Sequence, residues 1–311
     1  IGGAGSDTLN GQGGIDTVSY AGAAGAITIT LASIAPQVTG GSGTDTLSNF
    51  ENIIGSGFAD NLTGDGSANT IEGGAGADVL VGGGGNDTAS YAGSSAGVTV
   101  SLTSGTGVGG DAAGDTLAAF SNLTGSALND TLTGNLNANT LDGGAGDDIL
   151  IGAAGADALI GGTGINTASY AGAASAVSAS LTTGTGTLGD ANGDTFSGIQ
   201  NLTGSDNNDT LTGDANANIL VGGLGNDTLS AGNGNDTLDV RLGRDTAAGG
   251  NDDDIFWVDS VGGANLPTLV NGDANTAWTS GGGDSIRLFN LVNGGSYSLT
   301  SLANVTANME I

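Results

Sequence analysis

Asp or Asn recurs every nine residues in long stretches of this chain, each time after a Gly-rich run. Residues 55–90 read GSGFADNLT, GDGSANTIE, GGAGADVLV and GGGGNDTAS, with Asp or Asn sixth in each unit. If equivalent carboxylates stack at the spacing of neighbouring strands, about 4.8 Å, each pair repels by about 1 kcal/mol even at the dielectric constant of water. Such a row requires a cation, and oxygen ligands without His or Cys favour Ca²⁺.

The elements that position this row follow from the unit itself. Its Gly-rich half turns sharply, because Gly tolerates positive φ and lets a backbone carbonyl approach an ion. Its other half, with Leu, Ile or Ala eighth, has room only for a very short strand whose eighth side chain points inward. Two units then make a coil of about 18 residues, which places each sixth residue directly above its equivalent.

Blocks of these units alternate with longer segments, here called inserts. The blocks are residues 2–19, 55–90, 125–169 and 204–257, and the inserts are residues 20–54, 91–124 and 170–203. Each insert is close to two coils long, so we expect it to continue the solenoid as a wider coil without the Gly-Asp turn. Strands with alternating apolar residues are expected at Ile27–Leu31, Val98–Leu102 and Val177–Leu181. Each insert opens on a tyrosine, Tyr20, Tyr91 or Tyr170, expected to close a roll block; a ligand-binding aromatic row is the alternative.

Composition excludes several classes of function. The 311 residues include 63 Gly and no Cys, His or Lys, and the formal net charge is −29. This charge excludes nucleic-acid binding, which needs cationic side chains, and no apolar run is long enough to insert into a membrane. Gly93, Ser95 and Gly97 match the G-x-S-x-G nucleophile pattern, but the chain has no His to act as a base. We therefore expect no enzyme activity.

The repeat core is thin, with about one large apolar side chain per nine-residue unit. Burial at ~25 cal/mol per Å² is weak against ~1–2 kcal/mol of backbone entropy per ordered residue. Metal binding should supply the difference, so the metal-free chain is expected to be largely disordered.

The Gly-Asp units resemble the RTX (repeats-in-toxin) family of calcium-binding nonapeptide repeats, G-G-x-G-x-D-x-U-x. The inserts are similar to segments found between such units in bacterial surface-layer proteins and large modular adhesins. The resemblance implies an all-β, right-handed parallel β-roll with several Ca²⁺ ions in its turns. It also implies secretion to the bacterial cell surface by a type I system, through a C-terminal signal outside this sequence, which we take to be a fragment.

The resemblance also implies the ligands. The predicted pairs are Asp60 with Asp78, Asn69 with Asp87, Asp130 with Asp148, Asn139 with Asp157, Asp148 with Asn166, Asp209 with Asp227, Asn218 with Asp236, Asp227 with Asp245, and Asp236 with Asp254. Backbone carbonyls near the turn glycines would complete each shell; these are Gly73, Gly76, Gly82, Gly85, Gly143, Gly146, Gly222 and Gly225. Asn ligands lower the site's charge and predict weaker sites, and Arg244 beside Asp245 is a candidate to displace a cation. Asp7 and Asp16 stand in a block too short to complete a pair.

The predicted organisation is 1–54, a partial block plus insert; 55–124 and 125–203, each a block plus insert; 204–257, a block; and 258–311, a C-terminal β cap or the start of a next module. The favoured function is that of a calcium-stabilised structural segment of a surface layer, adhesin or filament, with self-association or other surface components as partners. The alternative is the C-terminal folding and secretion module of a type I-secreted hydrolase. An ice- or sugar-binding face, suggested by outward Thr residues, is the third hypothesis.

Overall fold

The computed structural model describes residues 3, 5–40, 43–259, 268–270 and 285–289. The chain divides into two compact units, Ile1–Asn166 and Thr167–Ile311. Most of the predicted C-terminal cap, 258–311, lies outside the described residues. The helical elements among the described residues are short 3₁₀ turns, and neither is long and apolar enough to cross a membrane.

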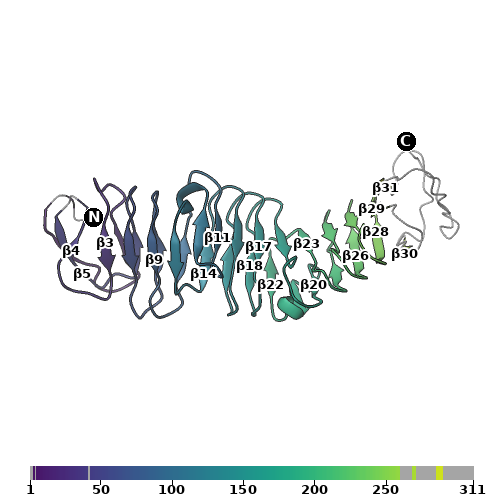
Figure 1. The fold of residues 1–311 in the computed structure, drawn as a ribbon, viewed down its shortest axis with the longest axis horizontal. Coiled ribbons are helices and arrows are strands. Elements are labelled where there is room, and N and C mark those ends of the chain that lie inside the picture. The colour runs from purple at the N-terminus through teal and green to yellow at the C-terminus, as the bar shows by residue number, and fades with distance from the viewer. Residues whose placement is uncertain (1–2, 4, 41–42, 260–267, 271–284, 290–311) are drawn as a thin grey trace. The chain divides into compact units, whose positions relative to one another are not determined.

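The first unit is a stack of short coils whose repeat strands alternate between two sheets (Figure 1). One sheet has the order β2 (Thr17–Ser19), β6 (Asn52–Ile54), β8 (Thr70–Glu72), β10 (Thr88–Ser90), β14 (Asn122–Thr124), β16 (Thr140–Asp142) and β18 (Ala158–Ile160). The other has the order β3 (Thr28–Thr30), β7 (Asn61–Thr63), β9 (Val79–Val81), β13 (Thr116–Ala118), β12 (Thr106–Val108), β11 (Thr99–Ser101), β15 (Thr131–Thr133) and β17 (Ile149–Ile151). At the N-terminal end, β1 (Thr8–Asn10), β5 (Thr44–Ser48) and β4 (Gln37–Val38) form a small third sheet.

The second unit repeats this arrangement. One sheet has the order β22 (Thr195–Ser197), β21 (Thr185–Leu188), β20 (Ser178–Ser180), β24 (Thr210–Thr212), β26 (Thr228–Asn233), β28 (Thr246–Asn251) and β30 (Thr268–Val270). The other has the order β19 (Thr167–Ser169), β23 (Asn201–Thr203), β25 (Ile219–Val221), β27 (Thr237–Asp239), β29 (Ile255–Asp259) and β31 (Ser285–Phe289).

The pairing register confirms the predicted parallel β-roll. Asn61 pairs in parallel with Val79, and Asn52 pairs with Thr70, so equivalent residues of successive coils lie 18 apart. The eighth residue of each unit is the core residue: Leu62, Ile71 and Leu80 are each 0 % exposed. Their neighbours in the same strands face outward, as alternation along a strand requires.

The inserts continue the roll, and they add two features that the sequence did not predict. In the second insert, β12 pairs antiparallel with β11. The short 3₁₀ turn η1 (Gly110–Ala112) follows β12 and leads to β13, which also pairs antiparallel with β12. The third insert repeats this with β20, β21 and β22, and with η2 (Gly189–Ala191). The closing half of each insert also carries an Asp, although the inserts were expected to lack the Gly-Asp turn: Asp115 and Asp194 directly precede β13 and β22, and Asp45 lies within β5.

Candidate metal centres

The sixth residues of successive coils stack in ladders at the turns of the roll. The amide N–H of Asp60 donates to Oδ1 of Asp78 at 2.8 Å, and that of Asn69 donates to Oδ1 of Asp87 at 2.8 Å. The same bond joins Asp130 to Asp148, Asn139 to Asp157, Asp148 to Asn166, Asp209 to Asp227, Asn218 to Asp236, Asp227 to Asp245, and Asp236 to Asp254. The structure therefore brings together every predicted pair.

The second carboxylate oxygen distinguishes two kinds of ladder residue. Asp78 is 0 % exposed, and its Oδ2 has no hydrogen-bond partner among the described residues. The other carboxylates with a buried, unpartnered Oδ2 are Asp87, Asp148, Asp227, Asp236 and Asp245, together with Asp7 and Asp16 of the short first block. A buried carboxylate oxygen without a donor is costly unless a cation or a proton compensates it.

The unpartnered oxygens lie beside the turn glycines. A Cβ built on Gly73 would lie 2.2 Å from Oδ2 of Asp78, so only Gly leaves this space open. Gly76 has φ +149°, and a Cβ there would lie 2.6 Å from the carbonyl oxygen of Phe58 in the preceding coil. A Cβ on Gly143 or Gly222 would likewise meet the Asp of its own unit, and a Cβ on Gly82 would meet both Asp87 and the Ala119 carbonyl. A Cβ on Gly85, Gly146 or Gly225 would meet the backbone of the preceding coil. Each cradle thus combines a carboxylate with backbone carbonyls.

Burial raises the pKa of these carboxylates in the absence of metal. Burial, opposed by the hydrogen bond from the Asp60 amide, raises the pKa of Asp78 to about 7. Burial likewise raises the pKa of Asp227 to about 7, and of Asp148 and Asp236 to about 6. It also raises the pKa of Asp87 and of Asp245. All six of these residues have an Oδ2 without a donor among the described residues, so without metal they take up protons at a higher pH than an ordinary Asp does.

The first sixth-position Asp of each of the three longer blocks (55–90, 125–169 and 204–257), here called the opening Asp, is held by protein donors instead. In Asp60, Oδ2 accepts the amide N–H of Ser56 at 2.6 Å, and Oδ1 accepts the Ser56 hydroxyl at 2.8 Å. Oδ1 also accepts the amide N–H of Ile27, an apolar residue at the register of a sixth residue in the insert. Asp130 with Ser126 and Val98, and Asp209 with Ser205 and Val177, repeat this arrangement.

The sixth residue of the second unit in each of these three blocks, here called the opening Asn, is satisfied within the protein as well. Oδ1 of Asn69 accepts the amide N–H of Asp65 at 2.7 Å, and its Nδ2 donates to the Glu51 carbonyl at 2.8 Å. Asn139 makes the same two bonds, accepting from the Asn135 amide and donating to the Ser121 carbonyl. Asn218 accepts from the Asp214 amide and donates to the Gln200 carbonyl. An amide group that donates to a carbonyl occupies the place where that carbonyl would otherwise face a cation.

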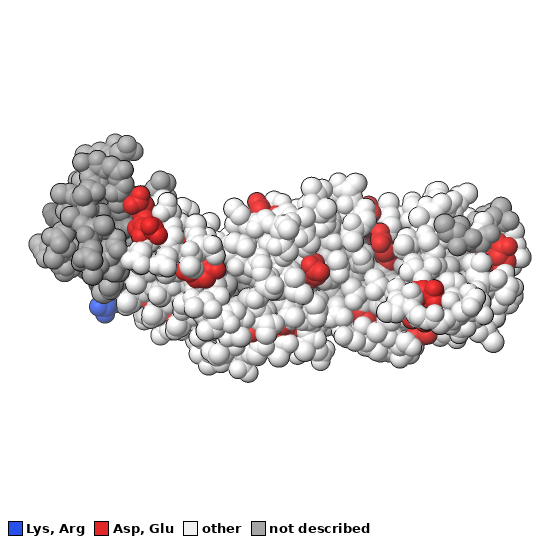
Figure 2. All heavy atoms as spheres, turned by 180° about the vertical axis from the view of Figure 1, so that it is seen from behind, with Lys and Arg blue, Asp and Glu red and all other residues white. Residues whose placement is uncertain are grey.

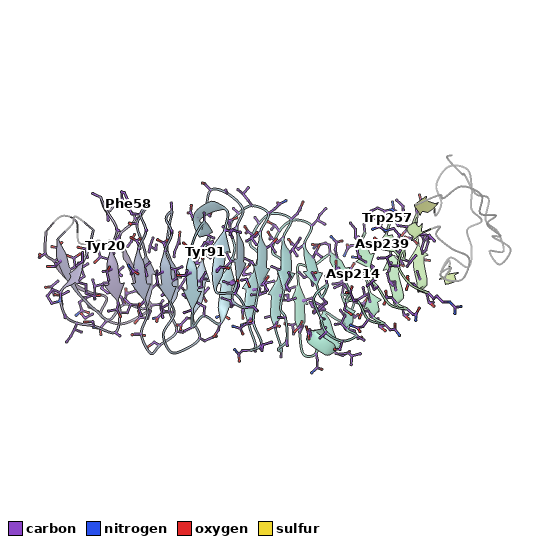
Figure 3. The ribbon with its side chains drawn as sticks, in the orientation of Figure 1. Tyr20, Phe58, Tyr91, Asp214, Asp239 and Trp257 are labelled. Atoms are coloured by element: carbon purple, nitrogen blue, oxygen red, sulfur yellow. The ribbon has the colours of Figure 1, made fainter. Side chains whose placement is uncertain are left out.

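Each insert closes its ladder with a buried aspartate, the closing Asp, that accepts a tyrosine hydroxyl. Tyr91 donates to Oδ2 of Asp115 at 3.0 Å, and Oδ1 of Asp115 accepts the Asp78 amide N–H at 2.8 Å. Tyr20 with Asp45 and Tyr170 with Asp194 form the same pair. Tyr20 and Tyr91 lie within the stacked coils rather than on a binding surface (Figure 3), which fits a closing role for these tyrosines.

Arg244 does not occupy the site of its neighbour. Its backbone N–H donates to Asn226, and Oδ2 of Asp245 has no hydrogen-bond partner among the described residues. The nearby Arg241 pairs with Asp239, and its guanidinium lies 5.4 Å from the Trp257 ring centroid. The structure therefore gives no support for a guanidinium in place of the cation.

The donor set fits a hard cation. In the part of the chain that the structure describes, no group of three or more His, Cys, Asp or Glu side chains gathers as a metal site. The ligands available are carboxylate oxygens and backbone carbonyls, which suit Ca²⁺. On the face shown in Figure 2, Asp and Glu are scattered, and the ladder carboxylates are buried in the turns.

These features define a calcium-binding parallel β-roll. The family model of the RTX calcium-binding nonapeptide repeat matches residues 1–19, 54–89, 124–159, 133–168, 194–229 and 230–260, which together are more than half of the chain. The chain therefore belongs to the RTX calcium-binding nonapeptide repeat family, whose repeats bind calcium ions. A search of curated proteins found no match.

Sequence reasoning missed the residues that close and open the ladders. Asp45, Asp115 and Asp194 stand in the recurring motifs TDTL, GDTL and GDTF, and Ser56, Ser126 and Ser205 are the second residues of the first unit in each of the three longer blocks. Both signals recur at corresponding places along the chain. Without the fold, nothing indicates that a tyrosine some 24 residues earlier reaches the closing Asp.

Proposed function

We propose that this chain is a calcium-stabilised structural segment of a bacterial extracellular protein, a surface layer, adhesin or filament, without catalytic activity. The observation that carries this proposal is the way the inserts fold. Their strands join the sheets formed by the repeat strands: β11 pairs with β15, β13 with β9, and β20 with β24. Inserts of this kind add length to the coil stack of each unit, whereas a catalytic domain would need a pocket of its own.

The side chains that suggested other activities have structural roles. The tyrosines that suggested an aromatic row are buried and donate to closing Asp residues. Among outward-facing strand residues, Val79 is 44 % exposed and Ile149 is 42 % exposed, so the Thr rows are interrupted and do not form the uniform face that ice or sugar binding would use.

Location and partners follow from the same proposal. RTX-repeat proteins are typically secreted by bacteria, and a roll that needs calcium to neutralise its carboxylates suits an extracellular environment. We propose secretion by type I machinery through a signal elsewhere in the full-length protein, and self-association or contact with other surface components. A net charge of −29 disfavours nucleic acid as a partner.

The test is a Ca²⁺ titration of EDTA-stripped protein, followed by far-UV circular dichroism and by light scattering in the same samples. We expect the β-signal to increase with Ca²⁺ and not with Mg²⁺, because Mg²⁺ demands a near-ideal octahedral shell of shorter bonds. Growth into ordered multimers with Ca²⁺ would support the structural role. Folding that stays monomeric at all concentrations would favour the second candidate, a folding and secretion module attached to a hydrolase.

A further inference from the structure

We propose that each insert, together with the two repeat units after it, forms a calcium-independent segment, and that only the coils between these segments require calcium. The calcium-independent segments, here called insert segments, are residues 20–72, 91–142 and 170–221. The coils that follow these segments, here called calcium segments, are residues 73–90, 143–169 and 222–257, and the short block 2–19 is assigned to neither kind. The proposal rests on the family's calcium binding and does not depend on whether the chain self-associates.

The start of each block carries the first argument. A cation between Asp60 and the coil before it would face Ile27, an apolar residue that is 1 % exposed, in place of a second carboxylate. Ser56 donates hydrogen bonds to both oxygens of Asp60, so these donors take the place that a cation would have beside the carboxylate. The other two opening Asp residues have the same surroundings. Asp130 accepts from Val98 in the preceding coil and from Ser126, and Asp209 accepts from Val177 and Ser205.

The opposite turn of the same coil carries the second argument. Asn69 has no charge to neutralise, and both polar atoms of its amide are bonded to backbone groups. The opening coil of a block is thus complete at both turns without metal. In the next coil, by contrast, Asp78 and Asp87 each leave a buried Oδ2 without a donor.

The other end of each block carries the third argument. The closing Asp115 receives the Asp78 amide in the geometry of a ladder carboxylate, but its second oxygen is occupied by the Tyr91 hydroxyl. The tyrosine therefore ends the ladder by placing an O–H donor where the other ladder residues leave an oxygen open. Tyr20 with Asp45 does the same, with the Asp7 amide as the ladder donor, and the Tyr170 hydroxyl likewise donates to Oδ2 of Asp194.

The inserts also bury more apolar surface than the repeats. Within 91–124, the buried side chains include Tyr91, Val98, Val100, Leu117, Phe120 and Leu123. The block 55–90 buries Leu62, Ile71, Leu80 and the small Ala89 over a similar length. Strands β13, β12 and β11 pair with one another and then with β15 of the opening coil. An insert segment therefore has both a larger core and a hydrogen-bonded sheet of its own.

Hydrogen exchange of the full chain, read by mass spectrometry, tests the proposal. In EDTA-stripped protein we expect amides of residues 91–142 and 170–221 to exchange at least about ten times more slowly than those of 73–90 and 222–257. Saturating Ca²⁺ should then protect both kinds of segment. Equal exchange of all segments without Ca²⁺, with protection gained everywhere in one step, would overturn the proposal.

A pair of variants separates the two kinds of coil. Tyr91→Phe should speed exchange of 91–124 in calcium-free protein and leave the number of bound Ca²⁺ ions unchanged, whereas Asp78→Asn should lower that number and leave calcium-free exchange of 91–142 unchanged. Ser126→Ala, which keeps the Ser126 backbone donor, serves if Tyr91→Phe does not fold. Loss of a Ca²⁺ ion in Tyr91→Phe or in Ser126→Ala would contradict the assignment.

Discussion

The hydroxyl of Tyr91 donates to Oδ2 of Asp115 at 3.0 Å, and both side chains are buried at the end of a carboxylate ladder. Burial and this hydrogen bond both affect the pKa values of the two groups. Burial raises the pKa of Asp115 to about 6 against the lowering effect of hydrogen bonds from the Asp78 amide and Tyr91. Burial, the Asp115 charge and the hydrogen bond to Asp115 raise the pKa of the Tyr91 hydroxyl. A neutral donor thus takes the place that we propose for calcium at the ladder carboxylates.

Removing this hydroxyl should destabilise the roll with or without calcium. Tyr91→Phe leaves a buried carboxylate oxygen unpaired, which costs about 1–3 kcal/mol. Denaturant unfolding at saturating Ca²⁺ would measure the loss. A double-mutant cycle with Asp115→Asn isolates the pair, and a coupling energy near zero would contradict the importance of this bond.

Two ladder aspartates should respond differently to the same substitution. Asp78→Asn removes a carboxylate whose Oδ2 has no donor, so isothermal titration should show fewer bound Ca²⁺ ions. The matched control, Asp60→Asn, removes the charge from bonds with Ser56 and should cost about 1–3 kcal/mol of stability with the number of ions unchanged. Equal loss of Ca²⁺ from both variants would show that opening Asp residues are ligands after all.

The space beside the carboxylate should matter for metal affinity. In Gly73→Ala, the new Cβ would meet Oδ2 of Asp78 at 2.2 Å, so the carboxylate must move out of its cradle. We expect Kd for Ca²⁺ at that site to rise by at least about tenfold. Gly57→Ala is the control, because a Cβ at Gly57 meets nothing within 4 Å; an equal effect in the control would refute the cradle.

Converting an opening Asn into Asp should create a demand for calcium. In Asn69→Asp, the donor to the Glu51 carbonyl is lost and a buried charge faces that carbonyl, so the calcium-free protein should be less stable. Added Ca²⁺ should restore much of this stability by binding between residues 69 and 87, which a Ca²⁺-dependent shift in Tm would detect. Asn216→Asp, at an exposed turn position, is the control, and a variant indifferent to Ca²⁺ would count against the site.

Stability of the calcium-free protein should fall as pH rises. The pKa of Asp78 and of Asp227 is about 7 in the folded state, above the ordinary value of about 3.9 in an unfolded chain. The folded state therefore holds more protons in this window, and its stability is lost as pH rises through about 7. Circular dichroism of calcium-free protein from about pH 5 to about pH 8 checks this.

Saturating Ca²⁺ should reverse the pH trend, because the cation then competes with protons for the same oxygens. The double variant Asp78→Asn with Asp227→Asn should show a flatter calcium-free profile than the parent. A calcium-free protein with the same β-signal across the whole pH range would contradict the role of these carboxylates.

The period of nine determined most of the architecture from sequence alone. Gly in the turns, an apolar eighth residue and Asp sixth specify the strand, the turn and the ladder within one unit, and these features repeat, so register follows from spacing. For this reason the spacing alone places Leu62 and Leu80 in the core and pairs Asp60 with Asp78, as the fold confirms.

Which ladder residues need a cation was decided only by the tertiary structure. Asp60 and Asp78 occupy the same position of the repeat, and they differ because Ser56 and the Ile27 amide reach one of them, while the other keeps an oxygen without a donor. The Tyr91–Asp115 bond likewise joins residues 24 apart through the folding of an insert that has no nine-residue period. A local repeat specifies local geometry, whereas the hydrogen-bond partners of a buried oxygen depend on whichever coils the chain packs against it.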